Sequence, residues 1–487
     1  MVSEVEPVSS TARLAPIAVD LDGSLLRIDT LHESLCSFLK CSPAGVAGAL
    51  LRIREGKAAF KRSVSEAAEL DVETLPLDEG LLDWLRAEHA RGRRLGLFTA
   101  ADQSIADAVA ERLPGLFDVV RGSDGRINLS GDRKADAIAA EFPEGFCYVG
   151  NAAVDVPIFA RAEAAILVGD VAKLRAMLPP GSQVEAEFPA PAAGWQVWRK
   201  ALRLSHWSKN LLVFVAPLLG FPVEGAPATL FEAVLLFVLM GMLASATYLA
   251  NDLFDLAADR RHPVKRYRPL AAGLITAHQA VLVAGGLMGA AFLLSLAFLP
   301  WLATLVLAIY LLVTTCYSFT LKRMPILDVI TLASLFTVRI LAGAALLEER
   351  VSLWLLTFSM LFFVGLAMVK RFAELERVVA SGGEGIDSRG YTAKDLPLLL
   401  GAGLASGFSA IVIFTIYLIQ EQYPRDIYRM PGLLWMMVPI IMVWLLRVWH
   451  LALHGRMDED PVAFALKDRF SLSLGVVSAI VLVAAWG

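Results

Sequence analysis

Charged side chains and cysteines are scarce in this chain of 487 residues. Only 19% of the residues are charged, and no long basic stripe occurs, which excludes a typical nucleic-acid-binding surface. The four cysteines form no CxxC pair and lack the spacing of zinc ligands, so we expect free thiols. The first residues lack a basic stretch followed by an apolar one. We therefore expect no cleavable signal peptide and a cytoplasmic front part.

Apolar residues, in contrast, are abundant and unevenly placed. They make up 56% of the chain, and the mean hydropathy is +0.59, which is more than a soluble protein needs. Residues 1–195 carry 29 acidic and 20 basic side chains, whereas residues 196–487 carry 19 and 24. An acidic front and a basic, apolar back predict two parts with different surroundings.

Residues 14–188 have the pattern of an α/β domain. Three short apolar runs are typical of buried parallel strands, at 17–23, 94–100 and 145–151. Two stretches between them have helix-like composition, at 102–113 and 133–142. The alternation predicts a doubly wound, Rossmann-type parallel sheet that binds ligands at the carboxyl ends of its strands. We also expect a helical cap at about 30–80 and a linker at 189–200.

Residues 201–487 predict an all-α membrane bundle. A helix needs about 20 apolar residues to cross a bilayer, and nine runs are long enough. These runs lie near 204–222, 230–250, 277–298, 301–319, 325–346, 352–370, 396–420, 431–451 and 469–486. Only Leu299-Pro300 separates the third run from the fourth, which predicts a tight hairpin.

The loops of this bundle predict its orientation. Lysine and arginine concentrate in the loops after the second, fourth, sixth and eighth runs, which we expect to be cytoplasmic. The front domain precedes the first run and would lie on the same side. We therefore expect an integral protein of the bacterial inner membrane with its sites at the cytoplasmic face.

An acidic helix end closes the second apolar run. Asp252, Asp255 and Asp259 fall within about 80° of one another on a helix, with Asn251 and Tyr248 one turn before them. Such carboxylates repel each other unless a cation joins them, and Mg²⁺ typically takes one or two carboxylates plus substrate phosphates. We therefore predict that the three aspartates are catalytic metal ligands that hold a diphosphate through Mg²⁺. The alternative is a solvated acidic helix end.

Basic residues follow this acidic cluster at once and suit phosphate oxygens. Those that we expect to bind substrate are Arg260, Lys265, Arg266 and Arg268. Four more basic residues at the cytoplasmic ends of spans have the same expected role, namely Lys209, Lys322, Lys370 and Arg371. The alternatives are the positive-inside signal for the first group and ordinary snorkelling anchors for the second.

Two charged residues lie inside the fifth run. Asp328 and Arg339 are separated by three helical turns and lie within about 20° of the same helix face. Charges within a span usually face the bundle interior or a substrate path. We predict a substrate role for both, and a structural intramembrane ion pair is the alternative.

The membrane half resembles the UbiA superfamily of intramembrane prenyltransferases, and within it decaprenyl-phosphate phosphoribosyltransferase. The resemblance rests on NDLFDLAADRRHPVKRYRPLAAG, HWSKNLLVFVAPL, YSFTLKRMPILDVI and VKRFAEL. It implies a polyprenyl phosphate acceptor and 5-phosphoribosyl diphosphate (PRPP) as donor. Many aromatic prenyltransferases of the superfamily have a second cluster spaced DxxxD, whereas Asp328 is followed at that offset by Leu332. This departure favours the phosphoribosyl branch.

The front domain resembles haloacid-dehalogenase (HAD) phosphatases. Four motifs carry the resemblance in the right order, at Asp20-Leu21-Asp22-Gly23, Thr99, Lys134 and Gly150-Asn151 with Asp155. It implies that Asp20 is the nucleophile and Asp22 the general acid and base. Thr99 and Lys134 would bind the phosphoryl group, and Asp20, Asp22 and Asp155 would ligate Mg²⁺. The fourth motif usually begins Gly-Asp, so Asn151 leaves a degenerate docking domain as the alternative.

Together these features predict a Mg²⁺-dependent phosphoribosyltransferase with a fused phosphatase. The product of transfer would be polyprenyl-phosphoryl-5-phosphoribose, from which the HAD-like domain would remove the 5-phosphate. The expected partners are PRPP, a polyprenyl phosphate and the bilayer, without nucleic acid, and a homo-oligomer is compatible with them. The alternatives are a prenyltransferase that uses an aromatic or other acceptor, and a transporter with a regulatory domain.

Overall fold

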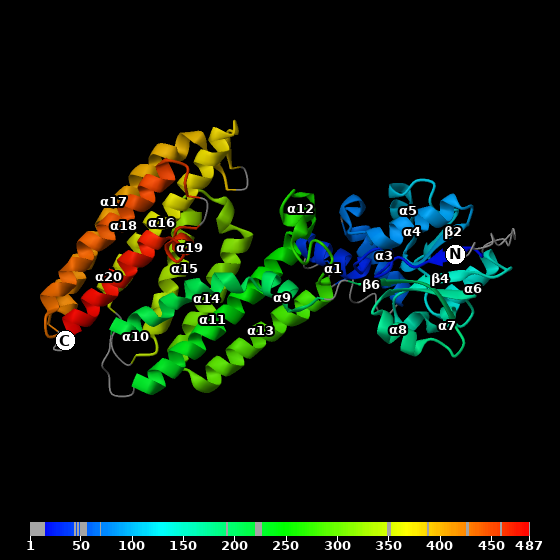
Figure 1. Cartoon of the computed structure of the whole chain (residues 1–487), viewed down its shortest axis with the longest axis horizontal. Helices are drawn as coiled ribbons and strands as arrows, with labels where there is room; N and C mark the ends of the chain where they lie inside the picture. Colours follow the sequence, from blue (N-terminus) through cyan, green and yellow to red (C-terminus); the bar gives the residue numbers. More distant parts are fainter. Residues whose placement is uncertain are drawn as a thin grey trace, which may run out of the picture. The chain divides into compact units, whose positions relative to one another are not determined.

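The computed structural model describes residues 15–42, 45, 48, 56–68, 70–190, 193–219, 226–347, 352–386, 389–424, 428–457 and 460–486. The chain divides into two compact units (Figure 1). The first combines Met1–Leu202 with Leu249–Val283, and the second combines Arg203–Tyr248 with Ala284–Gly487. The segment that contains the Asp-rich motif therefore belongs to the same unit as the front domain.

A six-stranded parallel sheet forms the centre of the first unit. Its strands are β1 (Ile17–Val19), β2 (Leu95–Asp102), β3 (Val119–Ser123), β4 (Cys147–Gly150), β5 (Ala164–Gly169) and β6 (Gln183–Pro189). Their order is β3-β2-β1-β4-β5-β6, and every neighbouring pair is parallel. The predicted Rossmann-type parallel sheet is thus confirmed, and its order reverses at β1 and β4, where such sheets bind ligands.

Helices cover both faces of this sheet. On one face α4 (Glu79–Ala90) and α5 (Gln103–Arg112) bury leucine, isoleucine and valine side chains. On the other lie α6 (Asp132–Glu141), α7 (Val156–Phe159) and α8 (Val171–Met177) (Figure 1). Strands buried on both faces explain why the sequence shows apolar runs instead of alternation.

The expected cap consists of helices in its described part. It contains α1 (Thr30–Cys41), α3 (Lys57–Ala67) and the 3₁₀ turn η2 (Val72–Thr74). Residues 43–44, 46–47, 49–55 and 69 of the cap lie outside the described residues. The linker predicted at 189–200 covers the last residue of β6 and most of α9 (Trp195–Ala201).

Eight helices in the described part of the chain are long and apolar enough to cross a membrane. They are α11 (Ala226–Phe254), α13 (Ala277–Phe298), α14 (Trp301–Phe319), α15 (Leu327–Ala344), α16 (Leu353–Ala380), α17 (Leu396–Tyr417), α18 (Met437–Leu453) and α20 (Arg469–Trp486). The predicted number of nine is therefore wrong.

The run at 204–222 accounts for the difference. It forms the 3₁₀ helix η4 (Leu204–Phe214) and the short helix α10 (Val215–Leu219), and residues 220–222 lie outside the described residues. Polar side chains interrupt this run. One of them, Asn210, is buried and accepts a hydrogen bond from Arg339. This amphipathic 3₁₀ segment has the apolar composition of a membrane span, but it does not form an α-helix long enough to cross a bilayer.

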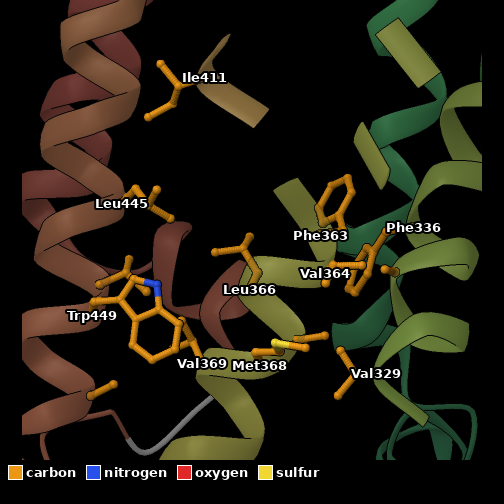
Figure 2. Close-up of a cluster of buried hydrophobic side chains, with 14 of the residues drawn as sticks. Val329, Phe336, Phe363, Val364, Leu366, Met368, Val369, Ile411, Leu445 and Trp449 are labelled. Carbon is orange, nitrogen blue, oxygen red and sulfur yellow. The ribbon is translucent and has the colours of Figure 1, made fainter. Parts of the chain in front are cut away.

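The core of the second unit lies where α15, α16, α17 and α18 meet. Figure 2 shows Phe336 of α15 against Phe363 of α16, whose rings stack with centroids 4.7 Å apart. Leu445 and Trp449 of α18 reach the same cluster from another side. A Cβ atom at Gly403 of α17 would come within 2.4 Å of the Trp449 ring. Small residues thus let these helices approach closely, as in other membrane bundles.

Candidate functional site

The Asp-rich motif lies at a break between two helices. Helix α11 ends at Phe254, Asp255 occupies a turn, and α12 (Leu256–Arg261) begins one residue later. The amide of Asp255 still donates to Asn251 O at 2.9 Å, and that of Asp259 donates to Asp255 O at 2.8 Å. The helix is interrupted rather than continuous as predicted, but the acids keep their spacing because these backbone bonds persist.

Asp252 and Asp259 converge on one cation. Arg268 Nη1 lies 3.1 Å from Asp252 Oδ1 and 2.5 Å from Asp259 Oδ2, and both aspartates are buried. Two carboxylates that face one positive group fit a divalent ion, which prefers oxygen ligands. No group of three His, Cys, Asp or Glu residues within the described ranges surrounds one ion position. The metal role of Asp252, Asp255 and Asp259 therefore stays a prediction.

The basic residues after the motif have different surroundings. Lys265 Nζ lies 3.9 Å from Asp259 Oδ1, and Arg268 joins the acids directly. Arg260 instead forms a buried ion pair with Glu33 of α1. Arg266 donates to the hydroxyl of exposed Tyr267 at 2.6 Å. Arg268 and Lys265 are thus placed at the acids, whereas Arg260 and Arg266 face other groups.

In the second unit, two predicted phosphate-binding lysines share one carboxylate. Lys209 Nζ lies 2.9 Å and Lys370 Nζ 3.5 Å from Asp460 Oδ2. Burial alone would raise the pKa of Asp460, but Lys209 and Lys370 hold it well below its usual range. Asp460 was missed because it stands in a loop, MDEDP, whose three acids look equivalent in the sequence.

More polar residues gather near this lysine pair. Tyr248 OH lies 3.3 Å from His206 Nδ1, and the guanidinium of Arg203 lies 4.6 Å from the centroid of the Tyr248 ring. Burial, Lys209 and Arg203 lower the pKa of His206 to about 4, so this imidazole is neutral at pH 7. The cluster of Arg203, His206, Lys209, Lys370 and Asp460, named the basic cluster below, therefore carries excess positive charge.

Arg339 and Asp328 do not pair with each other. Arg339 donates to Asn210 Oδ1 at 2.9 Å and to Tyr310 OH at 3.1 Å. Asp328 is fully buried, pairs with Arg371 and accepts from Tyr391 OH at 2.6 Å. The alternative of an Asp328–Arg339 ion pair is wrong, because each residue has a partner on another element.

Arg371 also pairs with Glu374, and Tyr317 OH lies 3.3 Å from its Nη2. Arg371 is therefore placed as a structural partner of Asp328 rather than beside Lys370, its neighbour in the sequence. Lys322, the remaining predicted phosphate ligand, lies in the 3₁₀ turn η6 (Leu321–Arg323) that precedes α15.

Three of the predicted HAD-like residues meet at the carboxyl edge of the sheet. Asp20 follows β1 and forms an ion pair with Lys134 of α6, whose Nζ lies 2.9 Å from Tyr148 OH. Tyr148 in turn donates to Asp155 Oδ1 at 2.9 Å. Burial raises the pKa of Asp20, Lys134 lowers it in part, and nearby Asp155 raises it further. Tyr148, which links Lys134 to Asp155, was missed by the sequence analysis.

Asp22, Thr99 and Asn151 complete this edge. Asp22 Oδ1 accepts the amide of Thr30 at 2.8 Å, and burial together with Asp29 raises the Asp22 pKa to about 7. A carboxyl with that pKa is suited to general acid–base work near neutral pH. Thr99 is fully buried, and its hydroxyl accepts from Ala101 N. The amides of Asn151 and Ala152 donate to Asp155 Oδ2, which fixes that carboxylate.

Comparison with known proteins identifies relatives over most of the chain. It is 38% identical over 479 residues to protein y4nM of Sinorhizobium fredii, covering 97% of this chain and 91% of that protein. It is 32% identical over 281 residues to the decaprenyl-phosphate phosphoribosyltransferase of Mycolicibacterium smegmatis, covering 55% of this chain and 86% of that protein.

A solved structure and a family model match the membrane half. A UbiA homolog from Archaeoglobus fulgidus bound to GPP and Mg²⁺ is 16% identical, with a TM-score of 0.45, and the match covers 59% of this chain and 98% of that one. The model of the UbiA prenyltransferase family matches residues 211–475, which is more than half of the chain. The predicted superfamily is thus confirmed, and the chain belongs to the UbiA prenyltransferase family.

Proposed function

We propose that this chain transfers 5-phosphoribose from PRPP to a polyprenyl phosphate, with Mg²⁺, at the cytoplasmic face of the bacterial inner membrane. The observation that carries the proposal is the convergence of Asp252 and Asp259 on the guanidinium of Arg268 in a UbiA-family chain. The relative called decaprenyl-phosphate phosphoribosyltransferase supports the same chemistry. The products are polyprenyl-phosphoryl-5-phosphoribose and diphosphate.

The surroundings of Asp328 support a monophosphate lipid over a lipid diphosphate. A second metal-bound diphosphate would need free carboxylates at this position, where many aromatic prenyltransferases of the superfamily have DxxxD. Here Asp328 is buried, paired with Arg371 and hydrogen bonded to Tyr391, and Leu332 replaces the second acid. Its charge is already compensated, so it is poorly suited to hold a metal.

The proposed reaction is a displacement at C1 of the ribose. The bond from C1 to the diphosphate breaks with its electron pair on the leaving group, and an oxygen of the lipid phosphate bonds to C1. Bound Mg²⁺ would neutralise the diphosphate and so stabilise its departure. Asp252 and Asp259 orient the donor, and Arg268 and Lys265 face its phosphate oxygens. Positioning and charge stabilisation then provide most of the catalysis.

The basic cluster is the proposed site of the lipid phosphate. Lys209 and Lys370 present two ammonium groups to one anionic oxygen of Asp460, which stands in for a phosphate oxygen. A phosphate that displaces Asp460 would gain two charge-assisted hydrogen bonds. Neutral His206 adds no repulsion toward Lys209, and its ring can accept or donate a hydrogen bond.

Mass spectrometry of the lipids formed by the purified chain tests the transfer. The chain in nanodiscs is mixed with PRPP, Mg²⁺ and polyprenyl phosphates of several lengths, and the expected product gains one phosphoribosyl group. A parallel reaction supplies a prenyl diphosphate and an aromatic acceptor. Incorporation of the prenyl group there, without incorporation from PRPP, would show that the chain is a prenyltransferase instead.

The α/β domain is the proposed phosphatase for the 5-phosphate. Asp20 would attack the phosphorus and form an aspartyl-phosphate, while Asp22, whose pKa is about 7, protonates the departing oxygen. Lys134 pairs with Asp20 and can neutralise the phosphoryl oxygens. Water then hydrolyses the aspartyl-phosphate, with Asp22 as the base.

Asp20→Asn separates the two proposed steps. The variant should keep the rate of phosphoribosyl transfer within about twofold and stop release of inorganic phosphate, because only the nucleophile of the second step is lost. The measurement is phosphate release together with the mass of the lipid product, which should retain the 5-phosphate. An unchanged final product in Asp20→Asn would exclude dephosphorylation by this domain.

A further inference from the structure

The first helix of the α/β domain contacts the Asp-rich segment within the first unit. Glu33 stands in the first turn of α1, and its two carboxylate oxygens lie 2.6 and 2.5 Å from Nη1 and Nη2 of Arg260. Both side chains are only 5% exposed. This buried ion pair is bidentate, with two parallel charge-assisted hydrogen bonds. Removing one partner is costly because the other charge would stay buried without compensation.

Arg260 stands next to Asp259 on a helix of six residues. Asp259 faces Arg268, whereas Arg260 uses Nε to donate to Ala271 O at 3.1 Å and its other nitrogens to bind Glu33. Arg260 thus ties α12 both to α1 and to the end of the loop that follows it. Neighbouring residues in so short a helix cannot move independently, so the Glu33 contact also restrains Asp259.

Three weaker contacts surround this pair. Arg261 Nη2 lies 2.7 Å from Asp71 Oδ2, and the rings of His32 and His278 lie 5.4 Å apart. Gly273 has φ +70°, and a Cβ atom there would come within 3.0 Å of Arg27 Cβ and 3.1 Å of Pro76 Cγ. The backbone of the loop therefore packs directly against the α/β domain.

From these contacts we propose that the α/β domain is a clamp for the Asp-rich segment, and that Glu33 is a positioning residue for phosphoribosyl transfer. Three aspartates within eight residues repel one another, and the segment ends a helix that is broken at Asp255. A segment under such repulsion keeps a fixed arrangement only if other groups hold it. Glu33 supplies that restraint through Arg260, which is a partner of Glu33 rather than a phosphate ligand.

Hydrogen exchange in the full chain with Glu33→Gln tests the clamp directly. Amides of residues 256–272 should exchange at least about tenfold faster, whereas amides of β2 should be unchanged. The matched control is Glu66→Gln, which removes a partner from the exposed Arg62–Glu66 pair of α3, where Glu66 is 62% exposed. Unchanged exchange at 256–272 in Glu33→Gln would overturn the clamp.

The functional part rests on the proposed transferase and has its own measurement. In Glu33→Gln the Mg²⁺ concentration for half-maximal transfer should rise about tenfold while the KM for the lipid phosphate changes less than about twofold. A change that only destabilised the fold would lower the rate of transfer without raising the Mg²⁺ requirement selectively over the KM for the lipid phosphate. Faster exchange with an unchanged Mg²⁺ requirement would overturn the positioning role. Absence of transfer in the wild-type chain would count against the proposed function, and the exchange result would still decide the clamp.

If the Glu33→Gln protein does not accumulate in the cell, a charge-swapped variant can test the same contact. The variant Glu33→Arg with Arg260→Glu retains a buried ion pair in the reverse sense. Exchange at 256–272 should return to within about threefold of the wild-type rate, because the pair and not the identity of either residue holds the loop. Exchange as fast as in Arg260→Glu alone would overturn the proposal.

Discussion

The Asp-rich segment and the basic cluster arrange their charges in opposite senses. In the first, the carboxylates of Asp252 and Asp259 both lie against the guanidinium of Arg268, and Lys265 Nζ lies 3.9 Å from Asp259 Oδ1. In the second, two ammonium groups, Lys209 and Lys370, share the single carboxylate of Asp460. In each, two like charges lie at most 3.5 Å from one shared opposite charge. The first is therefore suited to an added cation, and the second to an added anion.

A third ion pair differs in how its acid is surrounded, because Asp328 is fully buried and neighbouring side chains occupy both of its oxygens. Asp328 and Arg371 are both almost fully buried, and hydrogen bonds from Tyr391 and to Glu374 use their remaining groups. Such a pair has no capacity left for a ligand. Because Glu374 also pairs with Arg371, the number of charges does not separate this pair from the proposed substrate sites. The two occupied oxygens of Asp328 do.

The largest effect is expected for Asp252→Asn, which keeps the side-chain volume and removes one negative charge from the Asp-rich segment. Transfer should fall at least about 1000-fold, because the donor diphosphate loses its metal-mediated anchor. Initial rates with labelled PRPP in nanodiscs measure this. Asp83→Asn on α4, where Asp83 is 74% exposed, is the matched control and should be neutral. A rate within tenfold of wild type would contradict the role of this segment.

Arg371→Met should destabilise the membrane half, but unlike Asp252→Asn it should not remove the anchor of the donor diphosphate. It leaves Asp328 buried without its guanidinium, which costs about 3–5 kcal/mol of unfolding free energy. Unfolding in mixed micelles gives the value. Arg447→Met breaks the more exposed pair with Asp468, at 27% and 16% exposure, and should cost clearly less. Equal losses for the two variants would mean that burial of the Asp328–Arg371 pair does not raise its contribution to stability.

The smallest effect is expected for Lys209→Met, which removes one of the two ammonium groups of the basic cluster. The KM for the lipid phosphate should rise about 30-fold, since one charge-assisted hydrogen bond is lost, while the KM for PRPP stays unchanged. Asp460→Asn is the paired control, because it removes the competing carboxylate and should lower the same KM. If Asp460→Asn also raises the KM for the lipid phosphate, then Asp460 helps to bind the substrate or to position Lys209 and Lys370. Its carboxylate then does not occupy the place of a phosphate oxygen.

The architecture was largely predictable because its signals are local. Apolar runs of strand length between helix-like stretches predicted the parallel sheet, and runs of about 20 residues predicted the membrane helices. The error at 204–222 arose because composition cannot distinguish a 3₁₀ segment with a buried Asn210 from a span. The helix angle that grouped the aspartates was also local, and Asp252 and Asp259 do meet in space.

The sequence by itself determined the parallel sheet, the membrane helices, the family and the acidic and basic groups that matter for the proposed chemistry. Only the tertiary structure decided which of these groups pair. Arg260 meets Glu33 across 227 residues, Asp328 meets Arg371 instead of Arg339, and Asp460 joins Lys209 across 251 residues. Coulomb attraction acts between positions in space, and those positions are set by how distant helices pack, which local periodicity does not encode.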